Sequence, residues 1–189
     1  MTRGREILIG VSGGIAAYKA AGLVSQLVQG GQSVSVVMTS AAEQFVGPAT
    51  FAALSGRPVA SVMWDPGRYP LGPHIELAEQ ADLLCVVPAT ANFLSKAATG
   101  LADDLLSTLY LCFRGPVIMA PAMNWQMWEQ PSVQRNVTRL VEDGVTMVGP
   151  REGWLSCRQQ GVGRLADPDE IRHAIEETLG RLPGTNRGR

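Results

Sequence analysis

Residues 6–19 read EILIGVSGGIAAYK, an apolar run that ends in two glycines and then passes into a helical pattern. The run at 6–11 is almost continuously apolar, which is typical of a parallel strand that helices cover on both faces. Gly13 and Gly14 permit a tight turn between this strand and an amphipathic helix expected at 15–29. This strand–turn–helix unit predicts an α/β protein.

The same alternation continues through the rest of the chain. Further apolar runs occupy residues 33–38, 82–88, 116–121 and 145–150. Helical patterns occupy residues 92–111, 132–143 and 167–182. The order predicts a single doubly wound parallel sheet, Rossmann-like or flavodoxin-like, with helices on both faces. We expect one domain over residues 1–182 and a disordered tail at 183–189.

Composition excludes several classes of function. The formal net charge is −1 and the basic residues are scattered, so nucleic-acid binding is not expected. No apolar run approaches about 18 residues and no signal-peptide pattern opens the chain, which predicts a cytoplasmic protein without membrane attachment. The three cysteines have neither CxxC nor Cys/His spacing, so we expect no disulfide framework and no metal site. Cys85 and Cys112 lie in apolar segments and are expected in the core.

Ligands of such sheets bind beyond the carboxyl ends of the strands, so the loops there are candidate sites. In the first loop, the backbone N–H groups of Gly13 and Gly14 favour a phosphate and Ser12 adds a hydroxyl, although glycines also serve tight turns sterically. Thr39 and Ser40 stand where an NAD-binding protein usually carries an acidic residue. A mononucleotide such as FMN therefore fits better than NAD.

Two later loops combine polar and apolar side chains. PATANF at 88–93 offers Thr90 and Asn92 either to a ligand or to a helix N-terminus as caps. PAMNWQMW at 121–128 flanks Asn124 with large apolar residues, which suits a small polar ligand, or else core packing with Asn124 in a turn.

Two further residues stand out because their types are rare in this chain. His74 is one of two histidines and is either an acid/base group or a surface cap of the helix after Pro73. Cys157 lies in a glycine-rich stretch at 153–164 and is either a reactive thiol on a flexible flap or a buried structural thiol.

Taken in order, these segments resemble the homo-oligomeric flavin-containing cysteine decarboxylases, and most closely their phosphopantothenoylcysteine decarboxylase branch. The resemblance runs from Glu6 to about Asp169. The family's PASANT motif corresponds to PATANF, its PxMNxxMW motif to PAMNWQMW, and its active-site histidine lies within HIELAEQAD at 74–82. Its KxxxGxxDNLL run corresponds to residues 96–106, and its substrate-clamp cysteine is Cys157, followed by GVGR at 161–164.

The resemblance implies FMN-dependent decarboxylation of 4'-phosphopantothenoyl-L-cysteine to 4'-phosphopantetheine in coenzyme A biosynthesis. The substrate is oxidised to a thioaldehyde, loses CO2, and is reduced again from the enethiol. His74 is then the acid/base, Asn124 holds the substrate carboxylate and Cys157 donates a proton. Substrate contacts are expected from Met127, Ala122 and Arg158. FMN contacts are expected from Ser12, Gly13, Gly14, Ser40, Phe45, Thr90 and Asn92, and Asp103 is expected to act indirectly.

Some positions depart from the family pattern, and other functions share its chemistry. Phe93 replaces the last Thr of PASANT, Asp104 replaces an Asn, and Arg158 stands where Gly is commoner. The alternatives are a peptidyl-cysteine decarboxylase, a flavin prenyltransferase, and a non-catalytic flavin-binding regulatory subunit. The family implies a homotrimer or a multiple of trimers. In many bacteria the family's domain is fused to a phosphopantothenoylcysteine synthetase; here one helix follows the last motif, so we expect either a separate synthetase in the pathway or an enzyme of another pathway.

Overall fold

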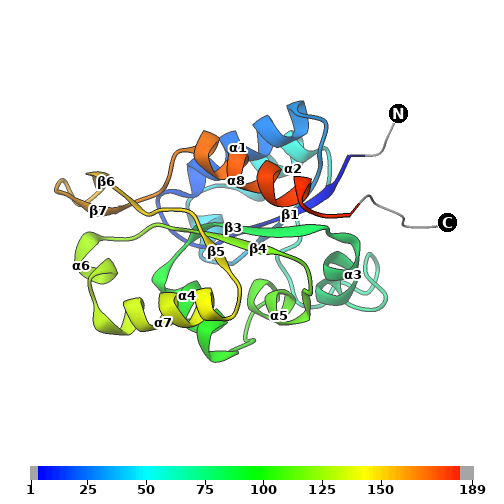
Figure 1. The fold of residues 1–189 in the computed structure, drawn as a ribbon. Coiled ribbons are helices and arrows are strands. Elements are labelled where there is room, and N and C mark those ends of the chain that lie inside the picture. The colour runs from blue at the N-terminus through cyan, green and yellow to red at the C-terminus, as the bar shows by residue number, and fades with distance from the viewer. Residues whose placement is uncertain (1–3, 184–189) are drawn as a thin grey trace.

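The computed structural model describes residues 4–183, which form a parallel sheet between two layers of helices (Figure 1). The sheet has five strands in the order β2-β1-β3-β4-β5. These strands are β1 (Glu6–Val11), β2 (Ser33–Met38), β3 (Leu83–Ala89), β4 (Val117–Pro121) and β5 (Thr146–Met147). This order is that of flavodoxin-like sheets, so the predicted fold class is confirmed.

The helices divide between the two faces of the sheet (Figure 1). One face carries α1 (Ala17–Gln29), α2 (Pro48–Ser55) and α8 (Pro168–Gly180). The other carries α3 (Pro73–Gln80), α4 (Ala91–Thr99), α5 (Leu105–Cys112) and α7 (Pro131–Glu142). The short helices η1 (Ala42–Gln44) and α6 (Trp125–Trp128) follow β2 and β4. β6 (Arg151–Trp154) and β7 (Gln160–Arg164) form a separate antiparallel hairpin.

The core lies on both sides of the sheet because helices cover both. In β1, Ile7 and Ile9 belong to the cluster under α1 and α8, whereas Leu8 between them belongs to the cluster under α4 and α5. All three side chains are fully buried. Every residue of β3 is buried as well. This two-sided burial explains the near-continuous apolar runs from which the sheet was predicted.

Three expectations about elements need correction. Residues 92–111 are two helices, because α4 ends at Gly100 in a left-handed conformation (φ 72°) and Asp104 caps a new helix, α5. The fifth strand is shorter than residues 145–150. Cys112 is exposed, because it is the last residue of α5 and lies beyond the face that packs on the sheet. Cys85 lies in the core as expected.

Two further points concern the ends of the chain and its helices. The tail expected at 183–189 lies outside the described residues except for Pro183, whose carbonyl oxygen accepts a hydrogen bond of 2.7 Å from Arg5. Among residues 4–183, no helix has both the length and the apolar character that a bilayer crossing requires.

Candidate active site

A cavity of about 650 Å³ lies at the carboxyl ends of β1 to β4, and the hairpin β6–β7 forms one of its walls. The strand order reverses between β1 and β3, which is where ligands bind in open α/β sheets. The cavity brings together most of the residues singled out from the sequence. They are Ser12, Gly13, Gly14, Ser40, Thr90, Asn92, Ala122, Asn124, Met127 and Cys157.

The loop after β1 is tied to the loop after β3 by a buried hydroxyl. Ser12 is 2% exposed, and its Oγ donates to the carbonyl oxygen of Pro88 over 2.7 Å and accepts from the backbone N–H of Thr90 over 3.0 Å. These bonds fix the two loops that flank the point where the strand order reverses. Ser12 therefore holds the cavity wall in shape.

Gly13 fits this wall because it has no side chain. A Cβ atom there would lie 2.4 Å from the Cβ atom of Ala41 and 2.7 Å from its carbonyl carbon, so only glycine lets the loops after β1 and β2 meet. The helix α1 then begins with Ala16 as its N-cap residue, which provides no side-chain hydrogen bond. The backbone N–H groups of Ala17 and Lys19 in the first turn donate to the carbonyl oxygens of Gly14 and Ala16 over 2.9 and 3.0 Å. Gly13 and Gly14 line the cavity just before this turn, so the steric and the binding interpretations of Gly13 are compatible.

Thr90 and Phe93 show how the loop after β3 is built. The hydroxyl of Thr90 accepts from the backbone N–H of Phe93 over 3.4 Å, so the capping interpretation is confirmed, while the residue also lines the cavity. Phe93 is 1% exposed and its ring meets that of Tyr110 edge to face, with 6.3 Å between centroids. Phe93, which stands in place of the last Thr of the PASANT motif, therefore provides a ring packed in the core where the motif has a hydroxyl.

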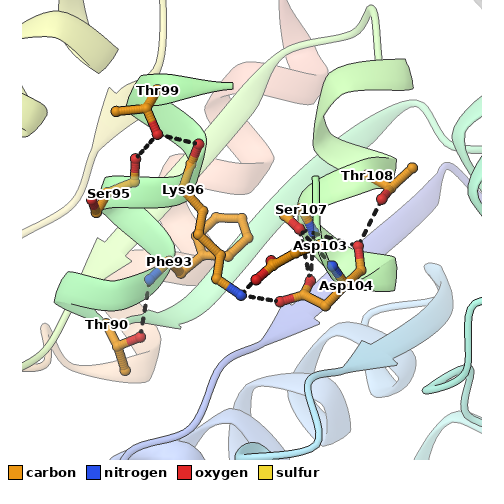
Figure 2. A network of polar contacts seen from close by, with 9 residues as sticks. All are labelled: Thr90, Phe93, Ser95, Lys96, Thr99, Asp103, Asp104, Ser107 and Thr108. Carbon is orange, nitrogen blue, oxygen red and sulfur yellow. Dashed lines mark hydrogen bonds and ion pairs between the residues drawn. The ribbon is translucent and has the colours of Figure 1, made fainter. Parts of the chain in front are cut away.

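A charged network forms the wall beside α4 and α5 (Figure 2). The Nζ atom of Lys96 lies 2.6 Å from Oδ1 of Asp103 and 2.8 Å from Oδ2 of Asp104. Asp104 also begins α5, where its Oδ1 accepts from the backbone N–H of Ser107 over 2.8 Å. Figure 2 shows Lys96 reaching from α4 to both carboxylates across the gap between the two helices.

The network keeps Lys96 and Asp104 charged. Burial alone raises the pKa of Asp104, but hydrogen bonds from Lys96 and Ser107 outweigh it and the net pKa lies below the ordinary value. Burial likewise lowers the pKa of Lys96, and the hydrogen bonds to Asp103 and Asp104 outweigh it, so the net pKa is raised. Lys96 and Asp104 both line the cavity, although neither was predicted from the sequence to belong to the site.

Asn124 uses one end of its amide for folding. Its Oδ1 accepts from the backbone N–H of Gln126 over 2.8 Å and so caps α6. The two Nδ2 N–H donors are not needed for this cap, and a side chain that lines the cavity in this way suits a carboxylate. Met127 is 46% exposed beside it, so core packing does not explain that residue.

Cys157 lies in the turn between β6 and β7. The turn is closed by backbone hydrogen bonds from Leu155 to Gln159 and from Arg158 to Leu155, each of 2.9 Å. Cys157 is exposed and lines the cavity, so the interpretation as a buried structural thiol is wrong. Its neighbour Arg158 adopts a left-handed conformation (φ 62°), is exposed, and does not line the cavity.

His74 and Phe45 also lie outside the residues that line this cavity. His74 is in the first turn of α3, which packs on α5, and its Nδ1 atom is buried without a hydrogen-bond partner among the described residues. Phe45 follows η1 and is 48% exposed. A single copy of the described chain therefore does not bring these two side chains to Asn124 and Cys157.

Several residues that line the cavity were missed in the sequence. Ile15, Tyr18 and Lys19 have the i, i+3, i+4 spacing of one helix face, and that periodicity at the start of α1 is the signal by which they were detectable. Trp154 and Arg164 come from the hairpin, whose strands carry no apolar period. Nothing local in the sequence marks these two.

Comparisons with known proteins agree with this geometry. The profile of the flavoprotein family matches residues 1–180. The coenzyme A biosynthesis bifunctional protein CoaBC of Bacillus subtilis (strain 168) is 45% identical over 189 residues, which cover 97% of this chain and 47% of that protein. The corresponding protein of Mycobacterium bovis is 46% identical over 167 residues, covering 88% and 40%. This chain spans about half the length of the curated relatives that it matches.

Solved structures share the fold over nearly the whole chain. The FMN-dependent cysteine decarboxylase SpaF has a TM-score of 0.82 and 34% identity, covering 96% of this chain and 98% of its own. A cysteine-to-serine variant of PPC decarboxylase in complex with pantothenoylaminoethenethiol has a TM-score of 0.82 and 29% identity, covering 94% and 100%. On the match of its sequence over residues 1–180, the chain belongs to the flavoprotein family.

Proposed function

We propose that this chain is an FMN-dependent decarboxylase that converts 4'-phosphopantothenoyl-L-cysteine to 4'-phosphopantetheine in coenzyme A biosynthesis. The observation that carries the proposal is the meeting of Asn124 and Cys157 at one cavity. An amide there holds a carboxylate and a thiol supplies a proton. The similarity to CoaBC and to a PPC decarboxylase supports the choice of substrate.

The cavity suits FMN in its donor set. The backbone N–H groups of Gly13 and Gly14 offer donors for a phosphate, Ser12 holds their loop by donating its hydroxyl to Pro88, and Ser40 after β2 lines the same cavity. Thr90 and Asn92 offer further polar groups. When bound, FMN supplies a two-electron acceptor and donor to the Cβ–S unit of the substrate.

The residues of the chain supply binding and proton transfer. Asn124 donates its Nδ2 hydrogens to the substrate carboxylate and orients it until CO2 leaves, while Met127 and Ala122 form apolar walls. The thioaldehyde accepts the electron pair that CO2 leaves behind, which gives an enethiolate. Cys157 then donates the proton that accompanies return of two electrons to the substrate.

His74 and Phe45 complete the site from a second copy of the chain. We propose that a second copy contributes them because both side chains lie outside the cavity of their own copy. We propose that the assembly is a homotrimer or a multiple of trimers and that it is located in the cytoplasm. In the assembly, His74 exchanges the proton of the substrate thiol and Phe45 packs against FMN. Arg158 on the exposed turn meets the substrate phosphate. A phosphopantothenoylcysteine synthetase produces the substrate.

The direct test is mass spectrometry of the FMN-loaded protein after incubation with 4'-phosphopantothenoylcysteine. We expect loss of one CO2 and formation of phosphopantetheine. A peptide with a C-terminal cysteine is assayed in parallel. Conversion of the peptide alone would replace the small substrate by a peptidyl one, and failure of both substrates in FMN-loaded protein would contradict the proposed decarboxylation.

The first prediction concerns Cys157→Ser. The hydroxyl is a far weaker acid than the thiol, so about one equivalent of CO2 per bound FMN should still be released, while phosphopantetheine formation falls by about 100-fold or more and FMN is left reduced. The enethiol should accumulate, and pantothenoylaminoethenethiol bound to a cysteine-to-serine PPC decarboxylase supports this expectation. Cys112→Ser, the same change at an exposed cysteine outside the cavity, is the control. Wild-type phosphopantetheine yields in Cys157→Ser would contradict the role.

A further inference from the structure

The hairpin that carries Cys157 is joined to the loop that carries Asn124 by a row of contacts, here named the Trp125 seam. The indole Nε1 of Trp125 donates to Oε1 of Gln159 over 2.8 Å. The backbone N–H of Met123 donates to the carbonyl oxygen of Gly163 over 3.0 Å. The seam therefore consists of one side-chain and one backbone hydrogen bond between segments that lie far apart in the sequence.

Two glycines let the segments approach this closely. A Cβ atom on Gly161 would lie 2.7 Å from Cβ of Trp125 and 2.9 Å from its Cγ. A Cβ atom on Gly163 would lie 2.2 Å from the carbonyl oxygen of Met123. Since real Cβ atoms do not approach other atoms so closely, β7 lies against residues 123–125 only because these positions are glycine.

Outside the seam, the hairpin is attached through Leu155, which is buried, and through ion pairs at its base. β6 and β7 pair with each other in a two-stranded sheet, and an isolated hairpin of this size is marginally stable in water. At its base, Nε of Arg151 donates to Oε2 of Glu170 over 2.8 Å. Nη1 of Arg164 lies 3.2 Å from Oδ1 of Asp167. These exposed ion pairs contribute little and lie at the end of the hairpin away from the turn.

The turn itself is held by Gln159. This residue directly precedes β7, and its carbonyl oxygen closes the turn by accepting from Leu155 over 2.9 Å. Cys157 lies between these two residues. The hydrogen bond from Trp125 thus attaches the turn that carries the thiol to the residue next to Asn124.

We propose that Trp125 and Gln159 are positioning residues, which hold the Cys157 thiol at the substrate that Asn124 binds. The proposal rests on the proposed function. Neither residue lines the cavity, so each acts through Cys157 and not on the substrate. Binding and CO2 release depend on Asn124, whereas proton donation depends on where the turn holds the thiol. Loss of the seam should therefore affect the second half of the reaction selectively.

Two variants remove the seam hydrogen bond from either side. Trp125→Phe keeps an aromatic ring over Gly161 and removes the N–H donor, and Gln159→Leu removes the acceptor at similar size. Gln126→Leu is the matched control, because it is the same change at the exposed residue next to Trp125. Gln159→Glu keeps an acceptor oxygen and serves as the rescue variant.

The first readout is amide hydrogen exchange over residues 155–164, which needs no substrate. Loss of one net hydrogen bond should speed exchange there about fivefold in Trp125→Phe and Gln159→Leu. Gln126→Leu and Gln159→Glu should exchange like the wild type. Unchanged exchange in both seam variants would overturn the proposal whatever the substrate proves to be.

The second readout is the partition of products, measured by mass spectrometry. In a single turnover, with FMN-loaded protein in excess over substrate and samples taken at a fixed time, the ratio of enethiol to phosphopantetheine should rise about fivefold in the seam variants. The rate of CO2 release should stay within about twofold of wild type, and Gln159→Glu should restore the ratio. An equal fall in CO2 release and in phosphopantetheine formation would indicate a merely structural role and overturn the proposal. Absence of CO2 release in the wild type would instead contradict the proposed function, and the exchange data would then decide on the seam.

Discussion

Asn124 serves folding with one atom of its amide and binding with the other. Its Oδ1 caps α6 by accepting from Gln126, and its Nδ2 group remains for the ligand. A turn residue and a substrate contact were alternative interpretations of the sequence. Since the two ends of an amide have different hydrogen-bonding capacities, a single side chain satisfies both.

Asn124→Asp separates these two tasks. The carboxylate keeps an acceptor for the cap of α6 but places a negative charge where the substrate carboxylate should bind. We expect normal folding and FMN binding, with decarboxylation reduced about 100-fold, because a charged hydrogen bond is replaced by repulsion. Steady-state rates and a flavin fluorescence titration measure the two effects. Gln126→Glu is the matched control, and turnover near the wild-type rate in Asn124→Asp would argue against the assigned role.

Ser12 illustrates a site residue whose main contribution is structural. Ser12→Ala removes the acceptor of the Thr90 N–H group and the donor to Pro88 at a position that is 2% exposed. An unsatisfied buried N–H group costs about 1–3 kcal/mol, so the free energy of unfolding of the FMN-free protein should fall by that amount. Urea denaturation measures it, with exposed Ser95→Ala as the control. A change within error of the control would mean that the two loops are held by other contacts.

At the scale of elements, the break between α4 and α5 creates the charged wall of the cavity. Gly100 ends α4 and Asp104 caps α5, and the five-residue segment from Gly100 to Asp104 lets Lys96 reach both carboxylates. In a single helix over 92–111, Lys96, Asp103 and Asp104 would all have been positions on the surface of that one helix. The error in that prediction therefore concealed the Lys96–Asp104 pair as well.

The pair predicts a defined pH dependence. The pKa of Asp104 is lowered in the folded state, so its stabilising effect is present above its ordinary pKa and is lost as the pH falls through the folded value. Asp104→Asn keeps the cap of α5 without the charge. It should be less stable than wild type by about 1 kcal/mol at neutral pH. The difference should shrink once the pH falls below the ordinary pKa of an aspartate and vanish only below the lower pKa of folded Asp104. Denaturation at several pH values tests this, with exposed Glu129→Gln as the control. A difference that does not depend on pH would show that the charge of Asp104 is not involved.

At the scale of the whole molecule, the described chain leaves several apolar side chains exposed near the site. Ile15 is 57% exposed, Tyr18 is 61% exposed and Phe45 is 48% exposed, and the first two line the cavity. Ile15 and Tyr18 line the same cavity, and large exposed apolar side chains that group together are typical of an interface. The position of His74 outside the cavity leads to the same expectation, because its proposed role requires a second copy.

Mixing two inactive variants tests this assembly. His74→Gln and Asn124→Asp each destroy a site, but if His74 reaches a neighbouring copy, a mixture contains sites in which both residues are intact. Dissociated and reassembled at equal amounts, the mixture should recover about a quarter of wild-type activity, with a mass near a multiple of three chains by light scattering. A mixture without activity, despite reassembly, would place His74 and Asn124 in the site of one and the same copy and would contradict the proposed assembly.

Local pattern was sufficient to predict the sheet and most of the cavity. The apolar runs mark β1 to β4 because both faces of each strand are buried, and a parallel sheet then places the loops after these strands at one edge. Ser12, Thr90, Asn124 and their neighbours meet there for that reason. The types of these residues also indicate which hydrogen bonds they can form, and this can be read from the sequence without knowing their contacts.

Only the packing of distant elements decided the rest. Trp125 and Gln159 are 34 positions apart, and their hydrogen bond depends on how the hairpin lies against the end of the sheet. The positions of His74 and Phe45 outside the cavity depend in the same way on where α3 and η1 pack. Hydrophobic periodicity reports which face of an element is buried, but it carries no information on which other element covers that face. The sequence alone thus determined the strands, the loops and their chemistry, whereas the tertiary structure determined which of these residues act together.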